Sequence, residues 1–416
     1  MNDMSSAREV FDKYKEHYDR YFSEDYPELG SGPISTEAYC SEDYFSKVKE
    51  KVYADAWFSV AHESELPNIG DYLVKEIPVF DSTVIIARGK DMEVRAFYNV
   101  CTHRSNQLIY QCGKGRAGSF TCPFHSWTFD LKGNLRGIPE RDRFLELDQE
   151  NLGLKQINIE SWKGLLFLNR AEKPKKNLTE YLGSWGESMK DYPFEKLYLA
   201  AAWEVDLDAN WKVVVDAFSE GYHIASIHKN VAPAMYKTNS AGHSRMGGFL
   251  PMDNHMSMVA SQNPTFVPSP IEGLARQLGG SSFIRGIEPG KMSWPGLNPG
   301  NQPPETWAFD VNVIFPSTFI DVSQGFAFTY EIYPIAHNKC RFSVKNYFVQ
   351  PVSWSERIGQ EFMLIQLREA LHEDLTTMES VQRGLASGAV KEMIFSDQEI
   401  ALRYHHKMLQ EAVSAE

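Results

Sequence analysis

The chain has 416 residues, of which 43% are hydrophobic and 23% charged, a composition typical of a folded protein with room for two domains. Its formal net charge of −13 argues against nucleic acid and anionic membranes as partners and favours docking of a basic protein face. No stretch approaches the roughly 18 apolar residues that a membrane span needs, and the charged start lacks the apolar core of a signal peptide. We therefore expect a cytoplasmic protein, whose five cysteines are reduced.

Short β segments dominate the chain from about 72 to 170. The segments 84–89 and 93–100 flank a Gly-Lys-Asp turn, a pattern typical of a hairpin. The charged, proline-containing run at 172–176 indicates a boundary. We predict three parts: an N-terminal helical extension over 1–40, a small β domain over 41–170 and a second domain over 171–416.

The second domain is predicted to combine helices with an antiparallel sheet. Residues 209–229 form a mostly helical segment, and 354–386 form a long helix of mixed charge. Between them, 309–349 has the pattern of an antiparallel meander, while 231–305 is rich in Gly, Pro, Met and Ser and is predicted to be a functional loop or lid. The overall fold class is therefore α+β.

Two short motifs in the β domain each combine one cysteine with one histidine. They are Cys101-Thr102-His103 and Cys122-Pro123-Phe124-His125. Zinc fingers usually pair Cys with Cys and His with His, the latter on a helix. One thiolate and one imidazole in each motif instead fit a [2Fe–2S] cluster with two Cys on one iron and two His on the other. A structural zinc site is the alternative.

The stretch NVCTHRSNQL…FTCPFHSWTFDLKGNLRGIP (99–139) resembles the Rieske domain of ring-hydroxylating oxygenase large (alpha) subunits. Ser105 and Ser126 stand where that family commonly has Gly. The resemblance implies an all-β Rieske [2Fe–2S] domain, followed by a catalytic domain with a helix-grip-like antiparallel sheet and long helices. The implied ligands of the [2Fe–2S] cluster are Cys101, His103, Cys122 and His125.

A second group of candidate ligands lies in the predicted second domain. His223 and His228 close the segment ANWKVVVDAFSEGYHIASIH, and Glu373 and Asp374 lie on the predicted long helix. Two His and one carboxylate form the facial triad of non-haem Fe(II) oxygenases. A separation of five residues puts two side chains about 140° apart on a regular helix, so the helix must end or bulge between the histidines. The spacing alone favours two ordinary polar helix positions over a pair of metal ligands.

The pattern N-W-K-x3-D-x3-E-x-Y-H-x4-H is similar to the family's mononuclear iron segment. The resemblance implies His223 and His228 as iron ligands and Asp374 as the third, with Glu373 as its nearest competitor. It also places Glu220 where the family has an acidic residue, most often Asp, that bridges two subunits.

By that analogy Glu220 links His125 of the partner subunit to His223 and provides a short electron path. Phe218 is predicted to face either the substrate pocket or the core. Soft apolar residues of 231–305 are predicted to roof the iron, and two tryptophans, at 294 and 307, are predicted to bind a cation or to belong to the core. The predicted lining residues are Met235, Met246, Phe249, Met252, Met256, Met258 and Phe283.

The resemblance implies an oxidoreductase that takes electrons from NAD(P)H through a flavin reductase, directly or by way of a ferredoxin. With O₂ it would hydroxylate an aromatic or bulky apolar substrate, using one [2Fe–2S] cluster and one Fe(II) per subunit. The family also implies a head-to-tail trimer, either a homotrimer or one with a small beta subunit. Two alternatives stay open. The first is a monooxygenase or demethylase for a non-aromatic or quaternary ammonium substrate, and the second is an electron-transfer protein without a second iron.

Overall fold

The computed structural model describes residues 20–148, 151–229, 244–263, 265–279, 297–299, 306–323 and 326–415. Within these ranges the chain forms two compact units. One unit runs from Tyr53 to Tyr181, and the other combines the chain up to Val52 with the chain from Leu182 onward. Of the helices in these ranges, none has the length and apolar character of a bilayer-spanning segment.

The unit from Tyr53 to Tyr181 is built from two antiparallel sheets. The larger sheet has the order β2-β11-β10-β5-β4-β3-β6, and the smaller has the order β7-β8-β9. Strands β4 and β5 pair from Val84↔Tyr98 to Arg88↔Val94, which confirms the predicted hairpin. The strands are β2 Phe58–His62, β3 Asp71–Ile77, β4 Ser82–Arg88, β5 Val94–Tyr98, β6 Gly113–Arg116, β7 Ser119–Thr121, β8 Thr128–Asp130, β9 Leu135–Gly137, β10 Gln156–Trp162 and β11 Leu165–Asn169.

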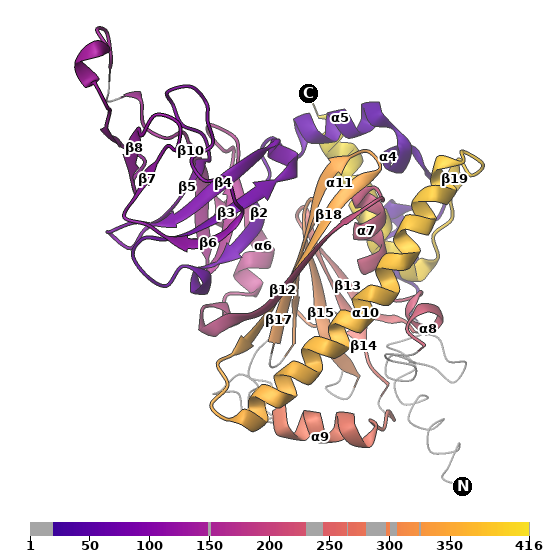
Figure 1. Ribbon diagram of the computed structural model, residues 1–416. Coiled ribbons are helices and arrows are strands. Elements are labelled where there is room, and N and C mark those ends of the chain that lie inside the picture. Colours follow the sequence, from indigo (N-terminus) through magenta and orange to yellow (C-terminus); the bar gives the residue numbers. More distant parts are fainter. Residues whose placement is uncertain are drawn as a thin grey trace. The chain divides into compact units, whose positions relative to one another are not determined.

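The second unit contains a seven-stranded antiparallel sheet with the order β12-β18-β17-β16-β15-β14-β13. Four consecutive strands, β15 to β18, form the predicted meander. The seven-stranded antiparallel sheet of the second unit and its long helices together confirm the α+β class (Figure 1). The strands are β12 Leu197–Leu207, β13 Met246–Met252, β14 His255–Ser261, β15 Trp307–Ile314, β16 Thr318–Val322, β17 Phe326–Ala336 and β18 Lys339–Val349, and a separate pair joins β1 Ile34–Ser35 to β19 Glu392–Met393.

The prediction of a loop or lid over 231–305 is wrong for residues 246–261 and 270–279. Residues 246–261 form the hairpin β13–β14, and Pro270–Gly279 form helix α9. The hairpin turns at Asp253 and Asn254, since Met252 pairs with His255. Nearly every residue of the hairpin is buried, so the sequence shows no alternation of apolar and polar residues.

The predicted long helix is confirmed as α10, Trp354–Ala386, which lies along one face of the sheet (Figure 1). The predicted helix over 209–229 divides into α7, Trp211–Phe218, and the single turn α8, Ile224–Ile227. Residues between these two helices therefore leave regular helical geometry. The remaining helices are α3 Phe22–Asp25, α4 Glu37–Cys40, α5 Glu42–Lys51, α6 Leu178–Ser188 and α11 Ile400–Ser414.

Replacing Lys345 by methionine is expected to destabilise the second unit by about 3–5 kcal/mol, because it leaves Glu331 as a buried, unpaired charge. The Lys345 Nζ atom lies 2.5 Å from Glu331 Oε2, and the two side chains are 3% and 0% exposed. Denaturant unfolding checks this loss. The double variant K345M/E331L is the control and should recover most of the stability, since it removes both charges.

Candidate metal centres and substrate cavity

The two cysteine-histidine motifs form two loops of the same local shape. In each loop the cysteine carbonyl accepts a hydrogen bond from the amide four residues on, at 3.0 Å from Ser105 to Cys101 and 2.9 Å from Ser126 to Cys122. Ser105 and Ser126 have φ of 59° and 58°, a left-handed conformation that favours glycine. This geometry explains why these two positions are the ones where the related sequences commonly carry Gly.

The burial of the four candidate ligands fits a [2Fe–2S] cluster. Cys101 and Cys122 are buried, while His103 and His125 are half-buried with ring centroids 4.7 Å apart. The His103 Nδ1 atom is buried and has no hydrogen-bond partner among the described residues, as expected of a metal ligand atom. Burial disfavours the Cys122 thiolate, but hydrogen bonds from the backbone of Phe124 and His125 outweigh it and lower the pKa of Cys122.

The second unit brings His223, His228 and Asp374 together. One ligand atom from each of the three side chains lies within 4.8 Å of the others. Asp374 Oδ1 is 3.1 Å from His228 Nε2 and 3.6 Å from His223 Nε2. Helix α8 begins after His223 and ends before His228, so both imidazoles escape the divergence that a regular helix would impose. This arrangement fits the facial triad that holds non-haem iron.

Helices α7 and α10, which flank the triad, are fixed by buried polar contacts. The backbone N–H of Asn210, at the start of α7, donates a 2.8 Å hydrogen bond to Gln382 Oε1 on α10. Lys212 forms a buried ion pair with Asp216, which also accepts a 2.6 Å hydrogen bond from the Tyr39 hydroxyl. These residues of the N-W-K-x3-D pattern therefore support the site without contacting the triad in the described structure.

Each triad histidine has a carboxylate on its other ring nitrogen. Glu220 Oε1 contacts His223 Nδ1, and Glu373 Oε2 lies 3.0 Å from His228 Nδ1. Burial opposes protonation of His223, but the hydrogen bond and negative charge of Glu220, with the charge of Asp374, outweigh it and raise its pKa. Three carboxylates around two imidazoles thus make a locally negative site that favours a bound cation. A carboxylate on Nδ1 also fixes the tautomer that leaves Nε2 free for a metal.

Replacing Glu373 by alanine is expected to weaken iron binding at the triad by about 10- to 100-fold, because His228 loses the acceptor that orients its ring. Iron titration of the chelator-treated protein measures this change. Glu373→Gln is the matched control: its amide oxygen can still accept from Nδ1, so the loss should be smaller. Equal losses in both variants would contradict an orienting role for this hydrogen bond.

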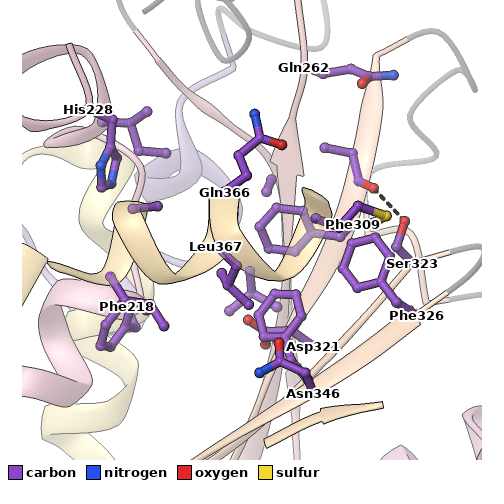
Figure 2. A pocket seen from close by; sticks show the side chains of 18 of the residues that line it. Phe218, His228, Gln262, Phe309, Asp321, Ser323, Phe326, Asn346, Gln366 and Leu367 are labelled. Carbon is purple, nitrogen blue, oxygen red and sulfur yellow. Dashed lines mark hydrogen bonds between the residues drawn. The ribbon is translucent and has the colours of Figure 1, made fainter. Parts of the chain in front are cut away.

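A cavity of about 450 Å³ opens beside the triad. Figure 2 shows His228 at one side of the cavity and Phe326 at the other, with Gln366 and Leu367 of α10 between them. Phe218 lines the cavity and also stacks on Phe342 at 5.2 Å, so it belongs to both the cavity and the core. Further lining residues fall into an aromatic group, Trp307, Phe309, Phe328, Tyr330, Phe348 and Phe362, and a polar group, Gln262, Arg276, Asp321, Ser323 and Asn346.

Most of the predicted methionine lining is not at the cavity. Met246 lines it, whereas Phe249, Met252, Met256 and Met258 are buried in the hairpin β13–β14 and do not line it. Trp307 lines the cavity and is 4% exposed, and its predicted binding of a cation stays a prediction. Three predicted residues, Met235, Phe283 and Trp294, lie outside the described residues. Asp321 and Asn346 were missed because no motif marks them.

Residues 194–415 match the family described as ring hydroxylating alpha subunit (catalytic domain), which is more than half of the chain. Residues 56–158 match the Rieske [2Fe-2S] domain. The chain belongs to the family of Rieske ring-hydroxylating oxygenase alpha subunits. The predicted family is thereby confirmed, and with it the pair of cofactors, a [2Fe–2S] cluster and a mononuclear iron. The assignment of individual ligands stays a prediction that the geometry above supports.

Relatives within this family act on different substrates. The carnitine monooxygenase oxygenase subunit of Acinetobacter baumannii is 36% identical over 199 residues, which cover 47% of this chain and 53% of that protein. The alpha subunit of 2-aminobenzenesulfonate 2,3-dioxygenase of an Alcaligenes species is 31% identical over 46% of this chain and 50% of that protein. The match thus spans about half the length of these relatives. A solved quaternary ammonium Rieske monooxygenase shares the fold, with TM-score 0.69, 24% identity and 91% and 96% of the two chains covered.

Proposed function

We propose that this protein is the oxygenase component of a Rieske monooxygenase that hydroxylates a quaternary ammonium substrate. The observation that carries the proposal is the His223–His228–Asp374 triad at the side of a cavity with aromatic walls. When bound, the [2Fe–2S] cluster and the iron supply electron transfer and O₂ activation. An electron-transfer protein would need neither the triad nor the cavity.

The chain's own residues prepare the site for this reaction. Glu220 and Glu373 hold the Nδ1 atoms of the two histidines, so that both Nε2 atoms face Asp374. The aromatic rings next to the triad exclude water and offer ring faces to a substrate. Because a quaternary ammonium group has no hydrogen to donate, charge and ring faces are the contacts by which a protein recognises it.

The substrate class proposed here replaces the aromatic substrate favoured by the sequence. Similarity to carnitine monooxygenase subunits and to a quaternary ammonium monooxygenase supports a quaternary ammonium substrate more strongly than an aromatic one. The soft apolar lining that suggested a bulky apolar substrate is mostly buried away from the cavity. A second candidate, hydroxylation of an aromatic sulfonate or acid, is favoured by the ring-rich walls and by the similarity to 2-aminobenzenesulfonate 2,3-dioxygenase.

Product analysis separates the two candidates. The protein would be reconstituted with iron, NADH and a ferredoxin reductase, then supplied with O₂ and either carnitine, glycine betaine, choline or a set of aromatic acids. Hydroxylation of a carbon beside the cationic nitrogen gives a carbinol that breaks into an amine and an aldehyde. Formation of this pair with stoichiometric NADH oxidation supports the proposal. A dihydrodiol from an aromatic acid, with no product from the cations, would overturn it.

The assembly and the electron path are also proposals, and they rest on the family resemblance. We propose a head-to-tail trimer, with or without a small beta subunit, that is reduced by a flavin reductase or ferredoxin. In a ring of this symmetry Glu220 would connect His125 of the partner subunit to His223. The contact between Glu220 and His223 within one chain supports half of this path.

A further inference from the structure

Three side chains from adjacent strands form a row along one wall of the cavity. Asp321 on β16 pairs with Phe328 on β17, and Phe328 pairs with Asn346 on β18. All three residues line the cavity, and Figure 2 shows Asp321 and Asn346 on the same side of it, opposite α10. Since neighbouring strands lie about 4.8 Å apart, the Cα atoms of Asp321 and Asn346 are about 10 Å apart, with the phenyl ring between them.

The two polar ends of this row lack partners of the kind that buried groups normally have. Asp321 is 2% exposed and accepts a 3.3 Å hydrogen bond from the Asn312 backbone amide. Within the described part of the chain no lysine or arginine pairs with it, and its charged neighbour is another carboxyl group, that of Asp310. Burial raises the pKa of Asp321 well above its usual range, which favours the neutral acid without a ligand, so a cation bound beside the group would favour its ionised form. Asn346 is 3% exposed, and its Nδ2 atom has no hydrogen-bond partner in the described part of the chain.

Buried polar groups without partners are rare and call for a ligand or another explanation. A carboxyl group beside an aromatic ring suits an organic cation, which the ring attracts by its face and the carboxylate by its charge. An amide donor at the far end of the row suits an oxygen acceptor on the same molecule. The row therefore has the order that a substrate with a cationic end and an oxygen-bearing end would need.

We propose that Asp321, Phe328 and Asn346 are the specificity determinants of the cavity: Asp321 is the counterion of a quaternary ammonium group held over Phe328, and Asn346 donates a hydrogen bond to a carboxylate or hydroxyl oxygen of the same substrate. This inference rests on the proposed function, which it deepens by naming the recognising residues and the second functional group of the substrate.

Binding measurements on the metal-loaded protein test the role of charge without any variant. Two pairs of probes differ only in replacement of the cationic nitrogen by carbon: glycine betaine with tert-butylacetic acid, and choline with 3,3-dimethylbutan-1-ol. Isothermal titration should give a cation affinity at least about tenfold above that of the carbon analogue. Equal affinities within both pairs, or binding of neither cation, would overturn the proposal.

Variants then assign the effect to residues. Asp321→Asn should lose the preference for glycine betaine over tert-butylacetic acid, whose own affinity should not fall. Asn346→Leu should weaken the binding of glycine betaine by about tenfold. The affinity for tetramethylammonium, which carries no oxygen, should be unchanged. If D321N still prefers glycine betaine over tert-butylacetic acid, the role assigned to Asp321 is contradicted. If N346L loses affinity equally for glycine betaine and tetramethylammonium, the role assigned to Asn346 is contradicted. Should D321N fail to fold, the comparison of the probe pairs with the wild-type protein still decides the role of charge.

Asp310→Asn is the matched control. Asp310 is a buried carboxyl on the neighbouring strand β15 that does not line the cavity, and it accepts a 2.8 Å hydrogen bond from Trp307 Nε1. Asp310 also accepts a 3.0 Å hydrogen bond from the Asn298 backbone amide, and its negative charge contributes to the raised pKa of Asp321. D310N therefore tests whether the charge of Asp310, rather than that of Asp321, attracts the cation, and it should keep the preference for cations. Product assays keep this inference distinct from the proposed function. If the preference for cations depends on Asp321 but no cation is converted to product, only the proposed function is overturned. If D321N forms product from the cations as fast as the wild-type protein does, only the inference is overturned.

Discussion

Asp374→Ala is expected to lower the iron content from three atoms per chain to two and to abolish product formation. Asp374 Oδ1 is the atom that both histidine Nε2 atoms face, at 3.1 and 3.6 Å. Two imidazoles alone lack the carboxylate charge and the third ligand of a facial triad, so they should not retain Fe(II). The cluster motifs lie in the other unit, and the Rieske absorption spectrum should therefore be unchanged.

Glu369→Ala is the control for this variant. Glu369 lies on the same helix α10, but it is exposed and pairs with Arg368. Iron analysis and the visible spectrum of both variants, measured on the same preparations, give the comparison. If D374A retains three iron atoms, the third ligand is another residue, and Glu373 is then the first to test. If it retains two iron atoms but still forms product, the triad is not the catalytic centre.

The candidate cluster ligands could be proposed from the sequence because their signals are local. Cys101 and His103 are two residues apart in the sequence, and Cys122 and His125 three, so a single loop delivers each pair. Asn210 also marks the start of α7, where its side chain accepts the Lys212 amide at 2.7 Å. These features depend on neighbouring residues and on the backbone, which a sequence pattern records directly.

The path of the chain around the histidines was only partly predictable. The five-residue separation of His223 and His228 requires a helix end between them, and α8 does end before His228. The break before His223 was not predicted. There the Glu220 side chain accepts a 3.1 Å hydrogen bond from the His223 backbone amide, which in a continued helix would donate to a backbone carbonyl. The same carboxylate therefore shapes the backbone and contacts the imidazole, which sequence spacing cannot separate.

The cavity was the least predictable feature, since it depends on the pairing of strands. Asp321, Phe328 and Asn346 form a row only because β16, β17 and β18 pair in one register, and a shift of one residue would turn them to the other face. In the sequence they are isolated residues within apolar strands. The methionine-rich segment gave the opposite error, because its composition suggested a lining where the fold makes a buried hairpin.

Glu220→Gln is expected to slow steady-state turnover by about 10- to 100-fold while all three iron atoms remain bound. The glutamine oxygen can still accept from His223 Nδ1, but the hydrogen bonds that the Tyr222 and His223 backbone amides donate to Glu220 Oε2 are lost, so iron content is measured in the same preparation. A carboxylate can accept hydrogen bonds from two imidazoles at once, whereas an amide offers one acceptor and one donor group. The proposed link from His223 to His125 of the partner subunit would therefore be broken at its far end.

The step that E220Q is expected to slow, electron transfer from the cluster to the triad, can be observed directly. The cluster would be reduced chemically, mixed with O₂ and substrate, and followed by its visible absorption. In E220Q the cluster should stay reduced for longer and product should form correspondingly slowly. Glu373→Gln, measured with iron in excess, is the matched control, because Glu373 holds the other triad histidine but lies outside the proposed path. Slow cluster oxidation in both variants would indicate that carboxylates at either imidazole affect the reaction only through the triad, and that Glu220 has no separate part in electron transfer.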